Sequence, residues 1–115
     1  MYKFSYAEVL EDAPQASRER ERQALDHCIS LLRAADERGP QSREATEALL
    51  FLRKLWTTLI EDLASPENDL PQALRADLIS IGLWVMREAD DIRLEKSTSF
   101  KDLIEVCAAI SEGLK

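Results

Sequence analysis

The sequence predicts an all-α fold: a small helical bundle of about four helices with an N-terminal arm. Nearly all large apolar residues recur at spacings of three and four, as they do along one face of an α-helix. The chain has only 3 Gly and 4 Pro in 115 residues, so long segments contain no residue that interrupts a helix. The clearest breaks, Gly39-Pro40 and the segment 65–71, separate stretches of helical length.

The bulk composition is typical of one domain that spans residues 1–115. Apolar residues make up 45% of the chain and charged residues 32%, which suits a single core without disulfides or metals. The net charge of −7 argues against direct nucleic-acid binding and against docking on an anionic membrane, because both need a concentrated positive field. The sequence shows neither a secretory signal nor a run of ~20 apolar residues. We therefore expect a cytoplasmic protein.

The arm comprises residues 1–12, and its aromatic residues alternate with polar ones, at Tyr2, Phe4 and Tyr6. Alternation suits an extended segment, although one helical turn could instead bring Tyr6, Val9 and Leu10 together. Three aromatic rings in so short a segment must be covered by other atoms. Two interpretations stay open: the arm packs on the domain's own core, or it contacts a partner.

The first helix is predicted from about Pro14 to Arg38, with an apolar stripe at Leu25, Cys28, Ile29, Leu32 and Ala35. Its first turns, SRERERQ, carry no large apolar residue, so we expect that end to be solvated. The arginines there alternate with glutamates and nearly cancel in charge, which argues against an RNA-binding patch. Gly39-Pro40 ends the helix, because glycine tolerates a left-handed cap and proline blocks continuation.

The second helix is predicted from Arg43 to Ala64, after Ser42 as its N-cap. One stripe contains Leu49, Leu52, Trp56, Leu59 and Leu63, and further apolar residues lie beside it at Leu50, Phe51, Leu55 and Ile60. These residues are too many for one face. A helix that is apolar on most sides is contacted on several sides, so we expect this helix to be central.

The third helix is predicted from Pro71 to Leu94, after a turn that two prolines stiffen. Its main stripe is Leu74, Leu78, Ile81, Val85 and Ile92, with a second at Ile79, Leu83 and Met86. Gly82 lies inside the helix at a cost of roughly 1 kcal/mol relative to alanine. Its presence predicts close approach by another helix or by a ring such as that of Trp56. We expect the second and third helices to form the centre of the bundle.

The last helix follows a polar break and carries Phe100, Leu103, Ile104, Cys107, Ile110 and Leu114. Ser99 and Asp102 resemble a capping box at its start. Cys28 and Cys107 both lie on apolar stripes, so we expect buried core residues that stay free thiols in a reducing compartment.

Residues that could support catalysis are scarce and badly spaced. His27 is the only histidine, whereas zinc sites draw on several His or Cys residues. Neighbouring carboxylates on a helix point about 100 degrees apart, so Glu61-Asp62 and Asp90-Asp91 form no shared site. There is no glycine-rich phosphate loop. The sequence therefore predicts no enzyme, no metal and no cofactor.

The two tryptophans have different predicted roles. Trp56 lies on the main stripe of its helix and is expected in the core. Trp84 lies between the two stripes of its helix and could reach the surface, where tryptophan often dominates binding energy. The candidate partner-binding residues are therefore Tyr2, Phe4, Tyr6 and Trp84.

The block from Leu55 to Met86, LWTTLIEDLASPENDLPQALRADLISIGLWVM, resembles the FlaF family of flagellar biosynthesis regulators. The matching positions are Leu55-Trp56-Thr57, Asp62-Leu63-Ala64, Pro66, Asn68, Leu70, Pro71, Leu74-Arg75-Ala76 and Leu78 through Val85. Tyr2 and Tyr6 also fit the family's N-terminal pattern, so the resemblance covers nearly the whole chain.

The resemblance implies a role in bacterial flagellum assembly through flagellin as partner. The family is associated with flagellin secretion, in a chaperone-like role, and with control of flagellin synthesis, and a regulator called FlbT acts in the same step. Two alternatives stay open. One is a post-transcriptional regulator of flagellin synthesis that acts through a protein complex with FlbT, and the other is a plain adaptor. The resemblance identifies no binding residues.

Overall fold

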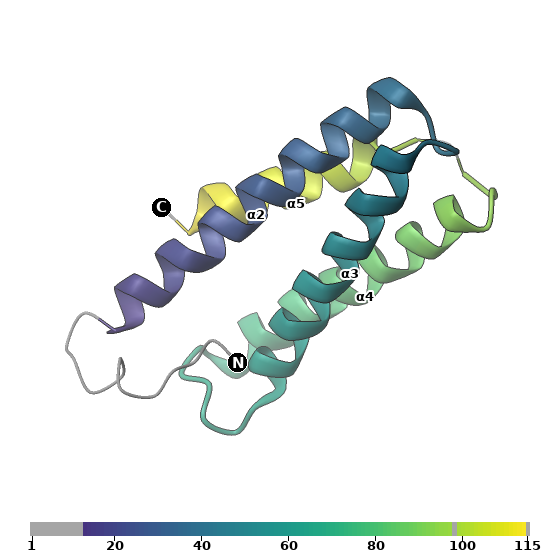
Figure 1. Cartoon of the computed structure of the whole chain (residues 1–115). Helices are drawn as coiled ribbons and strands as arrows, with labels where there is room; N and C mark the ends of the chain where they lie inside the picture. Colours follow the sequence, from purple (N-terminus) through teal and green to yellow (C-terminus); the bar gives the residue numbers. More distant parts are fainter. Residues whose placement is uncertain (1–12, 98, 115) are drawn as a thin grey trace.

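The computed structural model describes residues 13–97 and 99–114 and contains four helices in that part of the chain (Figure 1). They are α2 (Ala13–Arg38), α3 (Arg43–Ala64), α4 (Gln72–Arg93) and α5 (Lys101–Gly113). Neither described range contains a strand. The all-α prediction is confirmed, and the helix bounds lie close to the predicted ones. The predicted arm, residues 1–12, lies outside the described residues.

The helices form an elongated body of 44 × 23 × 22 Å, with α2 and α3 at its centre. α2 and α3 run antiparallel and pack against each other, α5 packs on α2, and α4 packs on α3 (Figure 1). α4 and α5 touch only slightly. The expectation that α3 is central is confirmed. The expectation that α4 shares the centre is wrong, because α4 contacts chiefly α3, and its N-terminal half leaves Leu74 43% exposed.

The core is built from the apolar stripes read in the sequence. Its largest fully buried side chains are Trp56, Phe100, Leu25, Leu32, Leu52, Ile92, Leu103, Val85, Cys28 and Cys107. Burial of each such aliphatic or aromatic side chain contributes about 1.5–3 kcal/mol. The predictions that Trp56 is a core residue and that both cysteines are buried free thiols are confirmed.

Local hydrogen bonds set where the helices begin and end. The Ser42 hydroxyl accepts a hydrogen bond from the Ala45 N–H at 3.1 Å, which caps α3 as predicted. Gly39 has φ of +99°, a left-handed conformation that glycine adopts without steric cost. The predicted capping box does not form, because Phe100 is the N-cap of α5 and the Ser99 hydroxyl accepts from Lys101 N–H at 3.2 Å.

The turn between α3 and α4 is held by side chains that reach the last carbonyl groups of α3. Asn68 donates its amide N–H to the Asp62 carbonyl at 3.1 Å and accepts from the Leu70 N–H at 3.0 Å. From α4, the Arg75 guanidinium donates to the carbonyls of Leu63 and Ser65 at 3.4 and 3.3 Å. The last carbonyls of a helix lack the partners that the next turn would supply. Here the backbone N–H groups of Ser65 and Asn68 satisfy the carbonyls of Asp62 and Ser65 in part, and the side chains of Asn68 and Arg75 complete the connection from α3 to α4.

Gly82 marks a close approach of α4 to α3, as the sequence predicted. A Cβ atom at this position would lie 2.8 Å from Ile60 Cγ1 and 3.0 Å from Trp56 Cε3. Both distances are below van der Waals contact, so only glycine lets the two helices pack this closely.

Candidate functional site

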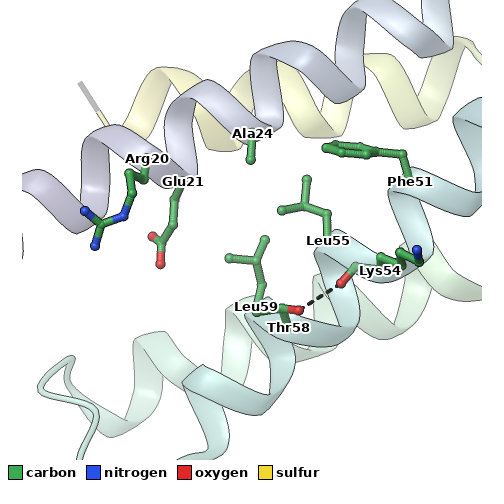
Figure 2. Close-up of a pocket in the computed structure, with 8 residues that line it drawn as sticks. All are labelled: Arg20, Glu21, Ala24, Phe51, Lys54, Leu55, Thr58 and Leu59. Carbon is green, nitrogen blue, oxygen red and sulfur yellow. Dashed lines mark hydrogen bonds between the residues drawn. The ribbon is translucent and has the colours of Figure 1, made fainter. Parts of the chain in front are cut away.

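A groove lies on the face of α3 that is turned towards the N-terminal half of α2. It has a volume of about 330 Å³ and its walls are mostly apolar. α2 contributes Arg20, Glu21 and Ala24, and α3 contributes Phe51, Lys54, Leu55, Thr58 and Leu59. Figure 2 shows Leu55 and Leu59 pointing from α3 towards α2, with Phe51 at one end of the row. We call this site the α2–α3 groove.

The groove exists because the two helices present side chains of unequal size. On α3 the groove side chains Phe51, Leu55 and Leu59 are large and apolar, whereas Ala24 is the one apolar residue that α2 supplies. The first turns of α2 carry arginine and glutamate where a bundle helix would carry leucine. The surplus apolar side chains of α3 are therefore only half-buried, and space remains between them and α2.

The apolar row of the groove has the spacing of a helix-binding surface. Phe51, Leu55 and Leu59 recur every four residues, which places them in a row about 12 Å long at 1.5 Å per residue. That length corresponds to about two turns of a second helix. A partner helix would meet such a row with apolar residues at spacings of three and four.

The rim of the groove carries basic side chains, although the chain as a whole is acidic. Arg20 and Lys54 lie at the rim together with one acidic residue, Glu21, while the whole chain carries −7. The Thr58 hydroxyl donates to the Lys54 carbonyl at 3.0 Å (Figure 2), so it is engaged within its own helix. Long basic side chains at a rim can cover apolar surface with their methylene stems and still reach acidic groups.

The single histidine packs at the end of the groove. The ring centroids of His27 and Phe51 are 4.9 Å apart, at an interplanar angle of 83°, an edge-to-face arrangement that aromatic rings favour. Within the described residues, no three His, Cys, Asp or Glu side chains gather as a metal site. The local chemistry of this end of the groove is therefore that of packing.

The cysteines are placed like core residues rather than reactive thiols. Both are fully buried, and Cys28 on α2 faces Cys107 on α5. Hydrogen bonding with the Cys107 thiol and burial together raise the pKa of the Cys28 thiol well above its usual value. Reactive cysteines are partly exposed and have lowered pKa values, so Cys28 does not resemble a nucleophile.

A second, smaller cleft of about 100 Å³ lies where α4 and α5 diverge. Its floor is formed by core residues of α2 and α3, and its apolar walls include Leu70, Leu78, Ile110 and Leu114. Two nearby leucines, Leu70 and Leu74, are 40% and 43% exposed. This cleft is too small to accept more than a few atoms in its present form.

Of the four predicted partner-binding residues, the structure describes only Trp84, and Trp84 does not line the α2–α3 groove. Tyr2, Phe4 and Tyr6 lie outside the described residues. Trp84 is half-buried on α4 and packs against the core. Sequence reasoning did not single out Phe51, Leu55 and Leu59 as a site, although their surplus apolar area was the signal.

Fold and groove together define a small all-α protein whose central helices leave an apolar, helix-sized groove with a partly basic rim. A family model described as "Flagellar protein FlaF" matches residues 2–114. The chain therefore belongs to the FlaF family, as the resemblance implied, and is a flagellar protein. No match was found among curated proteins or among solved structures. In the described part of the chain, no helix is both long and apolar enough to cross a membrane.

Proposed function

We propose that this chain binds flagellin before assembly, with a helix-forming segment of flagellin seated in the α2–α3 groove. The observation that carries the proposal is the half-buried row of Phe51, Leu55 and Leu59, which faces Ala24 across an open groove. An export substrate whose terminal segments become helical only in the filament exposes amphipathic sequence beforehand. A groove with apolar anchors at helical spacing covers such a segment.

Two further features support a binding role. The groove volume of about 330 Å³ lies at the low end of the range for ligand pockets, so it suits a few side chains of a larger partner. The rim residues Arg20 and Lys54 favour a partner segment with acidic residues beside its apolar ones. The chain acts by occupancy rather than catalysis. Its effects on flagellin secretion and on the controlled synthesis of flagellin follow from how much flagellin it holds.

Binding of the purified chain to unassembled flagellin, measured by titration calorimetry, tests the proposal. Leu55→Ala should weaken affinity by roughly thirtyfold, the loss of about 2 kcal/mol that a central apolar anchor typically gives. Leu50→Ala is the matched control. Leu50 belongs to the same helix and is 57% exposed, but it does not line the groove. Its replacement should leave affinity within twofold.

Each variant also needs a urea melt, so that loss of binding is separated from loss of folding. Wild-type protein with no measurable affinity for flagellin would end the proposal. Equal losses for Leu55→Ala and Leu50→Ala would move the binding site away from the groove. The predicted contacts Tyr2, Phe4, Tyr6 and Trp84 can be replaced in the same assay. The alternative, regulation through a complex with FlbT, predicts binding to that regulator without binding to flagellin.

A further inference from the structure

The α2–α3 groove lies beside the half of α2 that continues from the N-terminal arm. Its α2 wall runs from Arg20 to Ala24, seven to eleven residues after the first residue of α2 at Ala13. At 1.5 Å per residue, this wall lies about 10 to 17 Å from the start of the helix. Twelve residues of chain precede that start.

The arm is long enough to return to the groove. An extended chain spans up to about 3.3–3.6 Å per residue. The seven residues from Tyr6 to Ala13 therefore reach up to about 25 Å, and the eleven from Tyr2 reach further. Both spans exceed the distance from the start of α2 to Ala24. To reach the groove, the arm needs only a turn just before α2 that reverses the chain direction.

The chemistry of the arm matches the groove. Tyr2, Phe4 and Tyr6 alternate with polar residues, so on an extended segment the three rings share one face. Each buried ring removes roughly 150–250 Å² of surface from water, and the groove offers an apolar wall that the described chain covers only in part. The arm also carries three acidic side chains and one basic one. Their net negative charge complements the rim, where Arg20 and Lys54 outnumber Glu21.

We propose that the arm, residues 1–12, occupies the α2–α3 groove of the free protein through its aromatic residues, and that a partner must displace it. The displacement step rests on the proposed function, whereas occupancy by the arm does not. A tethered segment has an effective concentration in the millimolar range. If the separate arm peptide bound the groove with a dissociation constant of ~0.1 mM, the tethered arm would fill the groove about nine-tenths of the time. The apparent affinity of a partner for the groove would then be about tenfold weaker.

Thiol accessibility tests the occupancy directly in the chain of 115 residues. Thr58→Cys places a thiol in the groove lining. Thr57→Cys places one on the same helix at an exposed position that does not line the groove. The native Cys28 and Cys107 are 0% exposed and should not react in the folded state. Each variant is made with the native arm and with Tyr2, Phe4 and Tyr6 all changed to serine, and its reaction rate with a maleimide is measured.

The arm substitutions should raise the reaction rate of Thr58→Cys roughly tenfold and leave that of Thr57→Cys within twofold. An unchanged rate at position 58 overturns the proposal. An equal increase at both positions also overturns it, because that outcome reports general loosening of the chain. These rates need no flagellin, so they decide the proposal even if the chain binds none.

Flagellin binding then tests displacement. The chain with the serine-substituted arm should bind flagellin about tenfold more tightly than wild type, because its groove no longer has to be vacated. Weaker binding together with an unchanged Thr58→Cys rate would overturn the proposal and return the arm to the partner-contacting role that the sequence suggested.

Discussion

Helix α3 meets its two neighbours in opposite ways. Towards α4 the packing is so close that a methyl group at Gly82 would lie 2.8 Å from Ile60 Cγ1. Towards the N-terminal half of α2, the row of Phe51, Leu55 and Leu59 faces Ala24 across a groove of about 330 Å³. The apolar residues of α3 are similar in size on both faces. Whether a face becomes closed core or an open groove is therefore decided by the neighbouring helix.

The difference also separates two ways of using a small residue. Gly82 is small on α4 where the backbone must approach, so the space is filled by Ile60 and Trp56. Ala24 is small on α2 where the helices do not close up, so the space stays open. Small residues thus tighten one contact and leave the other incomplete.

The largest expected effect compares two aromatic rings of α3. Trp56 is 1% exposed in the core, and Trp56→Ala should cost about 3–5 kcal/mol of unfolding free energy through lost burial and the cavity left behind. Phe51 lines the groove and is half-buried, so Phe51→Ala should cost only about 1–2 kcal/mol. Urea melts of both variants measure the contrast. Similar losses would mean that the two faces are equally closed.

The tight face is tested by Gly82→Leu. Because a Cβ atom there already overlaps Ile60 and Trp56, the larger side chain should force the helices apart and cost about 1–3 kcal/mol. Gly113→Ala is the control, since a Cβ atom at Gly113 meets nothing within 4 Å, and it should stabilise the chain slightly. A melting temperature of Gly82→Leu at or above that of wild type would contradict the close crossing.

The open face is tested by Ala24→Leu, which enlarges a small residue as Gly82→Leu does. Leucine can extend into the groove, so stability should fall by less than about 0.5 kcal/mol or rise, as it does when a cavity is filled. Flagellin affinity should nevertheless fall at least tenfold, because the new side chain occupies the partner's place. A folded variant that binds flagellin normally would exclude this groove as the binding site.

The sequence predicted the parts of this comparison that depend on one helix at a time. Periodicity located the helices and their buried stripes, and Gly82 was correctly interpreted as a close crossing because glycine inside a helix needs a compensating contact. The peripheral place of α4 was not predictable in this way. The apolar spacing of Leu74, Leu78 and Ile81 is the same whether a neighbour covers the stripe or leaves it partly exposed.

The groove was missed for a related reason. The surplus apolar residues Phe51 and Leu55 were evident, but whether a neighbour covers them depends on which part of α2 lies opposite. The relevant signal was the absence of large apolar residues before Leu25, which indicated only a solvated helix end. The register between α2 and α3, which the short connection at Gly39-Pro40 sets, places that end against Leu55 and Leu59.

The smallest expected effect concerns the contact between α2 and α5. Cys28 and Cys107 are fully buried there, so this contact is closed, like the contact between α3 and α4. The usual pKa of a cysteine thiol is near 9, and in the folded chain the pKa of Cys28 lies well above it. Below pH 9 the thiol is protonated in both the folded and the unfolded state. As pH rises through 9, Cys28 ionises only in the unfolded state, so its contribution to folding stability is lost at up to about 1.4 kcal/mol per pH unit. The Cys107 thiol, whose pKa is lowered by the same hydrogen bond, contributes in the opposite direction.

Urea melts at pH 7.5 and pH 9.5 should therefore show a loss of just under about 1 kcal/mol that depends on Cys28. Cys28→Ala supplies the comparison: it lowers stability at both pH values through lost packing, but it should remove this part of the pH dependence. The same pH dependence in wild type and variant would mean that the Cys28 thiol ionises as readily in the folded chain as in the unfolded one. The α2–α5 contact would then admit water, and it would resemble the open face of α3 rather than the tight one.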